Sequence, residues 1–298
     1  MVSTILNGMS VDVEDYFQVS AFENSVDRRR WDRLESRVCQ NTDRLLAMFA
    51  ESNVRATFFV LGWVADRYPE LIERIASAGH ELASHGYSHR LVYNQSPEEF
   101  REDITRARDA IERACGQRVC GYRAPSYSIV ERSRWALDVL VEEGYLYDAS
   151  IFPIHHDRYG IPGAPRHVHR IECRTGRLWE VPGSTVRYAG MNLPVAGGGY
   201  FRLLPYRWTH WGISRVNRIE QTSSVFYLHP WEIDPAQPRI AASRLSQSRH
   251  YRNLDKTEGR LRRLLRDFRF GTVSEVLAHT AAATPGEALP RVEAVSVS

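Results

Sequence analysis

Two histidines, His85 and His89, stand four positions apart in the segment His-Gly-Tyr-Ser-His. On a helical turn this spacing projects both imidazoles to the same side, where they could bind one metal ion. The pair follows the short apolar segment 81–84, which we expect to be a strand. Catalytic residues of α/β barrels lie in the loops after strands, so this position favours a metal site over two unrelated histidines.

A second group of reactive side chains is acidic. Asp12, Glu14 and Asp15 end an apolar run that starts at residue 5. Carboxylates this close together repel one another unless a positive charge neutralises them, and a metal ion would do so. Strand alternation puts Asp12 and Glu14 on one face, which favours Glu14 as the acidic ligand. Asp15 takes that place if the strand bends there, so both remain candidate ligands.

Two further motifs follow predicted strands. Arg123 begins the segment Arg-Ala-Pro-Ser-Tyr, and His229 lies in Leu-His-Pro-Trp at the end of a strongly apolar run. An arginine can hold a carboxylate in one orientation, and a histidine can donate a proton near neutral pH. In a barrel both motifs would face the same mouth as the histidines and carboxylates.

The elements that position these motifs alternate between short β-branched apolar runs and segments of helical period, which is the pattern of βα units. At 298 residues the chain is long enough for one large barrel or two modest domains, and we expect one catalytic domain with elaborations. We therefore predict an α/β fold, an irregular (β/α) barrel of about seven strands with a C-terminal helical extension. The predicted strands are 5–13, 54–61, 81–84, 119–122, 145–150, 178–181 and 224–228, and the predicted helices are 42–50, 65–78, 97–115, 132–143, 258–268 and 273–282.

We predict three regions along the chain: a catalytic domain over 1–232, an extension that packs on the barrel over 233–282, and a tail over 283–298. The tail is rich in small residues and proline, which predicts disorder. Glycines in 183–199 predict a long loop or hairpin that borders a cleft.

The charge balance of 39 basic and 36 acidic residues is too even to predict nucleic-acid binding. No segment approaches the roughly 20 apolar residues that cross a bilayer. The start lacks a basic and then apolar leader, so we expect a cytoplasmic protein. Four cysteines without zinc-finger spacing predict free thiols: Cys39, Cys115, Cys120 and Cys173.

In their order along the chain, over about residues 9–231, the motifs resemble those of the polysaccharide deacetylase family, the NodB-like carbohydrate esterases. The segments Asp-Val-Glu-Asp-Tyr-Phe and Gly-Tyr-Arg-Ala-Pro-Ser-Tyr are most similar to those of bacterial deacetylases associated with exopolysaccharide and exosortase systems. The counterparts of the family motifs are Asp12 with Glu14 or Asp15, His85 to His89, Arg123 to Tyr127, Asp148-Ala-Ser, and Leu228-His229.

The resemblance implies a NodB-like barrel that holds one divalent metal, usually Zn²⁺ and sometimes Co²⁺ or another ion. It implies removal of N-acetyl groups from polymers of N-acetylglucosamine. For a cytoplasmic enzyme, a lipid-linked oligosaccharide precursor at the inner membrane face is an alternative substrate. The basic stretch 262–269 favours a solvated helix face, with contact to the membrane as the alternative. The implied roles are Asp12 as base held by Arg123, His229 as acid oriented by Asp148, His85 and His89 with Glu14 or Asp15 as ligands, and Ser126, Tyr127 and Trp231 at the substrate.

The sequence departs from the family pattern at three places. Asp-Val-Glu-Asp replaces an adjacent Asp-Asp pair, Ser88 stands directly before the second histidine instead of directly after the first, and Leu-His replaces Leu-x-His. Alternative functions are an allantoinase-like small-molecule amidohydrolase, an O-deacetylase on the same fold, and a carbohydrate-binding protein without activity. The oligomeric state is not predicted.

Overall fold

A mainly parallel sheet forms the centre of the protein, which is described over residues 5–283 by a computed structural model. The strand order is β10-β1-β2-β3-β4-β5-β7-β6, with β11 also paired to β1. Each pairing in this sheet is parallel except that of β6 with β7. The strands are β1 (Leu6–Val13), β2 (Thr57–Val60), β3 (Glu81–Ser84), β4 (Gly121–Tyr122), β5 (Tyr147–Asp148), β6 (His169–Cys173), β7 (Gly176–Glu180), β10 (Val225–Leu228) and β11 (Arg269–Gly271).

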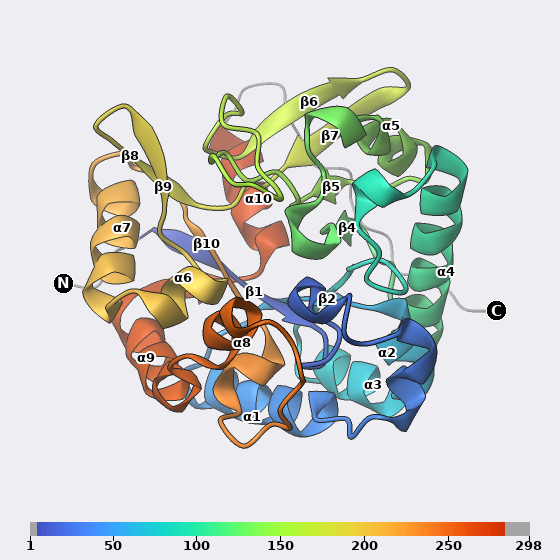
Figure 1. The fold of residues 1–298 in the computed structure, drawn as a ribbon. Coiled ribbons are helices and arrows are strands. Elements are labelled where there is room, and N and C mark those ends of the chain that lie inside the picture. Colours follow the sequence, from blue (N-terminus) through green and yellow to red (C-terminus); the bar gives the residue numbers. More distant parts are fainter. Residues whose placement is uncertain (1–4, 284–298) are drawn as a thin grey trace.

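The predicted α/β fold is confirmed, and each of the seven predicted strands coincides with an observed one. Strands β1 and β10 lie near the middle of the molecule, with the longer helices around them (Figure 1). Within residues 5–283 no pairing joins β10 to β6, so hydrogen bonds do not close the barrel between these two strands.

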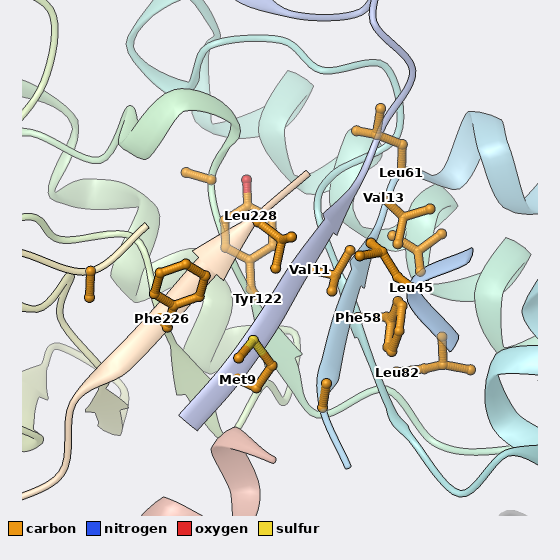
Figure 2. Packing of buried hydrophobic residues seen from close by; sticks show 14 of the residues in the cluster. Met9, Val11, Val13, Leu45, Phe58, Leu61, Leu82, Tyr122, Phe226 and Leu228 are labelled. Carbon is orange, nitrogen blue, oxygen red and sulfur yellow. The ribbon is translucent and has the colours of Figure 1, made fainter. Parts of the chain in front are cut away.

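Side chains alternate along β1, and this alternation separates the core from the site. Met9, Val11 and Val13 are fully buried and pack with Phe58 of β2 and Leu228 of β10 (Figure 2). Burying one such side chain stabilises the fold by about 1.5–3 kcal/mol. Ser10 and Asp12 lie on the opposite face, since successive strand residues point to opposite sides.

The helices of the first half agree with the sequence except in one place. The helix predicted over 65–78 is two helices, α2 and α3, that meet at Tyr68. Pro69 explains the break, because proline disfavours helical geometry in the residue before it and is itself accepted in a first turn. The helices are α1 (Val38–Glu51), α2 (Gly62–Arg67), α3 (Pro69–Ser77), α4 (Pro97–Cys115) and α5 (Trp135–Glu142).

The second half adds a hairpin and five helices to the barrel. The predicted hairpin is present as β8 (Thr185–Tyr188) and β9 (Met191–Pro194). Strand β11 pairs with β1 and α10 contacts it, so the C-terminal segment shares the central sheet. The predicted domain boundaries remain predictions, and the tail from 284 onwards lies outside the described residues. The helices are α6 (Gly198–Leu203), α7 (Tyr206–Arg218), α8 (Arg244–Tyr251), α9 (Leu254–Asp267) and α10 (Val273–Ala283).

Six short 3-10 helices complete the described secondary structure. No helix within 5–283 has both the length and the apolar character that a membrane crossing requires. The four cysteines carry free thiols. The 3-10 helices are η1 (Ser20–Phe22), η2 (Arg28–Arg33), η3 (Val92–Asn94), η4 (Pro125–Tyr127), η5 (Glu131–Ser133) and η6 (Pro230–Ile233).

Candidate metal centre and active site

The predicted motifs meet at one edge of the sheet because the strands that carry them run parallel. β1, β3, β4 and β10 end at residues 13, 84, 122 and 228, next to the four motifs. A cleft of about 570 Å³ opens at this edge. Its lining includes Asp12, Glu14, His85, His89, Tyr127 and His229.

Three of these residues form a group that could hold a metal ion. The ligand atoms of Glu14, His85 and His89 lie within 4.8 Å of one another, and all three residues are buried. His85 Nδ1 lies 2.8 Å from the carbonyl oxygen of Arg123, so a proton on Nδ1 is held there and Nε2 is left as a ligand. Burial lowers the pKa of His85 to about 4, which favours the neutral imidazole that metal binding needs.

One buried oxygen atom in this group is consistent with a cation. Glu14 Oε2 lies 2.7 Å from His89 Nε2, yet among the described residues it has no hydrogen-bond partner of acceptable geometry. Burial alone would raise the pKa of Glu14, but the histidines beside it lower that pKa to about 2. An ionised carboxylate that lies beside two imidazoles fits a divalent metal.

The loop that carries the two histidines is not the helical turn that the sequence predicts. Residues 85–89 lie outside the helices, and Gly86 and His89 have φ angles of 73° and 51°. A Cβ atom at Gly86 would lie 2.7 Å from Asp103 Oδ2. Asp103 of α4 accepts hydrogen bonds from the Tyr87 N–H at 2.8 Å and from Ser88 Oγ at 3.2 Å. The histidines are therefore brought together by a folded loop anchored to α4.

Glu14 and not Asp15 joins the histidines. The carboxylate of Asp15 accepts hydrogen bonds from Ser36 Oγ at 2.7 Å, from Arg37 N at 2.8 Å and from Val38 N at 3.2 Å, at the start of α1. Burial raises the pKa of Asp15 to about 6. Of the two candidate acidic ligands, Asp15 supports helix α1 and only Glu14 lies in the ligand group.

Asp12 and Arg123 form a buried ion pair beside this group. Arg123 Nη1 donates to Asp12 Oδ1 at 2.7 Å and to Ser10 Oγ at 2.8 Å, and its Nε donates to the Ala149 carbonyl at 3.2 Å. The guanidinium carbon lies 4.0 Å from the centre of the Phe59 ring. The arginine therefore holds one oxygen of Asp12 and leaves Oδ2 facing His229 Nε2 at 3.8 Å.

His229 is oriented by a different acid from the one predicted. Its Nδ1 donates to Glu232 Oε1 at 2.6 Å. Asp148 instead accepts hydrogen bonds from the backbone and hydroxyl of Ser150, beside the buried carboxyl of Glu180. The predicted role of Asp148 as the partner of His229 is wrong. The motifs that contain Asp148 and His229 are consecutive along the chain. Strand β5, which contains Asp148, and strand β10, which precedes His229, nevertheless do not pair in the sheet.

The environment of His229 favours its protonated form. Burial alone would lower the pKa of His229, but the carboxylates of Glu14, Glu232 and Asp12 outweigh it and raise that pKa to about 9. Its Nε2 lies 3.5 Å from Glu14 Oε1. A protonated imidazole at this place can donate a proton into the cleft.

The three predicted substrate residues all line the cleft, in different ways. Ser126 and Tyr127 both have φ angles of 53°, and Ser126 Oγ bonds to Ser20 Oγ at 2.7 Å. Trp231 donates from Nε1 to Glu14 Oε1 at 3.3 Å, and its ring stacks on that of His229 with centroids 5.1 Å apart. Trp231 therefore supports two reactive residues as well as lining the cleft.

Sequence reasoning missed Glu232, Arg202 and Asp103. Glu232 stands three positions after His229, a spacing that could have identified it as a partner. Arg202 binds Glu232 and follows a glycine-rich stretch, far from any motif in the sequence. Asp103 lies within an ordinary amphipathic helix, so its sequence context gives no signal.

Comparison with known proteins divides the chain into two matched regions. Residues 32–142 match the polysaccharide deacetylase family, and residues 149–278 match a domain of unknown function, DUF3473. A stretch of 98 residues is 33% identical to the peptidoglycan-N-acetylglucosamine deacetylase of Bacillus cereus, covering 33% of this chain and 36% of that protein. A stretch of 99 residues is 34% identical to a chitooligosaccharide deacetylase of Bradyrhizobium sp., covering 33% and 43%. The match therefore spans less than half the length of either relative.

Two solved structures share the fold over nearly the whole chain. One is a Mycobacterium smegmatis protein described as a candidate polysaccharide deacetylase, with a TM-score of 0.62 and 22% identity over 98% of this chain and 96% of that one. The other is the allantoinase Puue, with a TM-score of 0.65 and 14% identity over 95% and 92%. At these identities the similarity shows the fold alone.

Proposed function

Because the chain carries a polysaccharide deacetylase domain, we propose that it is a metal-dependent hydrolase that removes N-acetyl groups from amino sugars of a bacterial polysaccharide or its precursor. The observation that supports this most is a cleft that contains a possible metal site together with a candidate general base and a candidate general acid. Glu14, His85 and His89 make up that site, and Asp12 and His229 flank it.

Amide hydrolysis is slow because water is a weak nucleophile and an amine is a poor leaving group. A divalent cation bound by Glu14, His85 and His89 would activate water and polarise the acetyl carbonyl. Zn²⁺ is the proposed ion, with Co²⁺ or another divalent ion as the alternative, because two imidazoles and one carboxylate form an open three-ligand set.

Asp12 is the proposed general base. The ion pair with Arg123 fixes Oδ1, so Oδ2 is the oxygen that takes a proton from the attacking water. Arg123 is 2% exposed, so the proposed base lies beside a buried positive charge that fixes its position. A positioned base of this kind contributes about 10²- to 10⁴-fold to the rate.

His229 is the proposed general acid, which protonates the departing sugar amine from Nε2. The bond from Nδ1 to Glu232 keeps the imidazole in one orientation, with Nε2 toward Asp12 and Glu14. We propose the backbone N–H of Ser126 as a donor to the tetrahedral oxyanion. The N–H of Tyr127 is a poorer candidate because it donates to the Ala124 carbonyl at 3.1 Å.

The wall of the cleft suits a sugar. Tyr93, Tyr127, Tyr159 and Tyr200 line it, and aromatic rings offer flat apolar faces with a polar edge. We propose polymers of N-acetylglucosamine, or a lipid-linked oligosaccharide precursor, as the substrate. The proposed location is the cytoplasm, at the inner membrane face. The basic stretch 262–269 is a weak candidate for membrane contact, since Arg262 and Arg263 form ion pairs with acidic neighbours.

The test is incubation of the protein with acetylated chito-oligosaccharides, with and without chelator, followed by mass spectrometry of the sugar and an assay for acetate. We expect chelator-sensitive loss of acetyl groups from nitrogen. Activity on allantoin alone would favour the allantoinase-like alternative, and activity on O-acetyl sugars alone would favour an O-deacetylase. Sugar binding without any release of acetate would support a binding protein.

A further inference from the structure

Arg202 of helix α6 forms a buried ion pair next to the proposed general acid. It is 4% exposed, and its Nε donates to Glu232 Oε2 at 2.6 Å. Glu232 is 1% exposed, and its other oxygen accepts the Nδ1–H of His229 at 2.6 Å. One carboxylate thus joins the arginine to the histidine. A buried charge without its partner destabilises the fold, so the ion pair holds both Arg202 and Glu232 in this arrangement.

The same guanidinium also holds the end of helix α8. Arg202 Nη1 lies 2.9 Å from the carbonyl oxygen of Arg249, 2.7 Å from that of His250 and 3.4 Å from that of Arg252. Carbonyl groups at a helix C-terminus lack partners within the helix and attract cations. Arg202 is therefore the point at which α6, α8 and η6 meet.

A second route connects α8 to the same histidine. The ring of His250 stacks on that of Trp231 with centroids 4.1 Å apart, and the ring of Trp231 stacks on that of His229. His250 is in turn fixed by a 2.8 Å contact of its Nε2 with Gln237 Oε1. The segment that follows the barrel thus supports His229 both through Arg202 and through this stack of rings.

We propose that Arg202 is a positioning residue, which fixes Glu232 and thereby His229, and couples the general acid to helix α8. The inference rests on the proposed function, because it gives His229 the role of acid. The inference also assigns a role to part of the region that matches the domain of unknown function. That region, residues 149–278, contains Arg202, His229, Glu232 and His250. The proposed metal ligands Glu14, His85 and His89 all precede that region.

Lysine cannot replace this arginine fully. Arg202 uses two different nitrogens, one for the carboxylate and one for the carbonyl groups, whereas a lysine ammonium is a single point charge without the planar fork. Arg202→Lys therefore keeps the buried charge but loses the fixed geometry, while Arg202→Met loses both.

The matched control is Arg166→Met. Arg166 pairs with Glu220 at 2.8 Å and donates to the Thr185 carbonyl at 2.7 Å, so it too joins a carboxylate to a backbone carbonyl. It is not among the residues that line the cleft. A general effect of removing an ion-paired arginine would appear equally in this variant.

In kinetics on a chito-oligosaccharide, we expect Arg202→Met to lower kcat by roughly tenfold or more with KM changed less than about threefold, since a misplaced acid affects the chemical step. The loss should be smaller on an activated aryl acetate, whose leaving group needs little protonation. Arg202→Lys should fall between wild type and Arg202→Met. Equal losses in the Arg202 variants and in Arg166→Met, on both substrates, would make Arg202 a structural residue and overturn the inference.

A measurement that needs no activity separates the inference from the proposed function. In ¹⁵N-histidine-labelled protein, the Nδ1–H resonance of His229, assigned by its loss in His229→Gln, should be sharp in wild type and in Arg166→Met. It should exchange faster with solvent in both Arg202 variants. Unchanged exchange would overturn the positioning role, whatever the activity. Faster exchange in a protein whose wild type releases no acetate would refute the proposed function and leave the coupling of Arg202 to His229 standing. If Arg202→Met does not fold, Arg202→Lys carries both measurements.

Discussion

The carboxylates of Glu14 and Asp15 are adjacent in the chain and serve different parts of the molecule. Glu14 faces His85 and His89, whereas Asp15 faces the first backbone N–H groups of α1. The separation begins at the end of β1, where the Glu14 N–H donates to the Asp12 carbonyl at 3.0 Å in a tight turn. One turn thus places a candidate ligand and a helix cap side by side.

Substitution of Glu14 should therefore affect metal binding, and substitution of Asp15 should affect stability. Glu14→Ala should weaken binding of Zn²⁺ by more than about 100-fold, because loss of a ligand should exceed the 10- to 100-fold cost of losing an outer partner. Asp15→Ala should retain metal but lower the free energy of unfolding by about 1–2 kcal/mol, the cost of removing a helix cap. Metal titration and chemical denaturation of both variants measure this. Normal metal binding by Glu14→Ala would exclude Glu14 as the ligand.

One divalent ion should bind per chain. Two neutral imidazoles and a carboxylate provide a three-ligand site, so chelator treatment should remove both the metal and the activity, and added Zn²⁺ or Co²⁺ should restore them. Elemental analysis of protein purified without chelator measures the stoichiometry. His156→Ala is a suitable control, because that exposed histidine lies outside the ligand group. Metal absent from the untreated protein, with no response to added ions, would contradict the site.

Asp12→Asn should retain metal and lose about 10²- to 10⁴-fold in kcat, since the amide cannot accept the proton of water. The amide oxygen can still accept from Arg123, so the buried guanidinium keeps a partner and the fold should persist. Metal content, thermal unfolding and kinetics together separate these effects. Loss of metal with normal turnover after reconstitution would reverse the assignment and make Asp12 a ligand.

His229→Ala should leave the metal site intact and slow release of the amine. An activated aryl acetate has a leaving group that needs less protonation, so the loss on N-acetyl substrates should exceed the loss on the ester by well over tenfold, if acid catalysis is worth about 10² or more. Parallel kinetics on the two substrates provide the ratio. Equal losses would make His229 a group that binds the oxyanion or positions the substrate.

The pair of Asp148 and Glu180 should make stability depend on pH. Burial raises the pKa of Asp148 from 3.8 to about 6, and burial together with Asp148 raises the pKa of Glu180. Glu180 Oε2 has no hydrogen-bond donor among residues 5–283, which is consistent with a proton shared between the two carboxyls. A raised carboxyl pKa contributes stability that is complete below about pH 3.8 and is lost as the pH rises through about 6.

Asp148→Asn should accordingly reduce this loss, because the amide stays neutral and can donate to Glu180. The difference in Tm between variant and wild type should be more favourable to the variant at pH 8 than at pH 5. Thermal unfolding at both pH values measures it, and metal content should not change. A difference in Tm that is independent of pH would show that the pair does not change its protonation between pH 5 and pH 8 in the folded protein.

The sequence by itself determined the main architecture and the places of the motifs at the ends of the strands. β-branched apolar runs predict the seven strands, because such residues fit a pleated buried surface. The helix predicted over 97–115 has the same bounds as α4, which in the structure starts after the capping box of Ser96 and Glu99 and ends at the left-handed Gly116. Once these strands are parallel, the motifs at their ends must meet at one edge, as His85, Arg123 and His229 do.

Tertiary structure alone decided which side chains touch. Alternation along β1 favoured Glu14, but only the turn after the strand and the start of α1 show where Asp15 points. Helix α8 is polar and lacks a repeating apolar face. Its local sequence pattern therefore does not predict that it packs beside the site. Arg202 reaches Glu232 across 30 positions and His250 across 48. Such contacts depend on how whole elements pack. A buried charge is stable only when a partner lies beside it, and the packing of distant segments decides which residue that partner is. The spacing of residues along the chain does not predict this pairing.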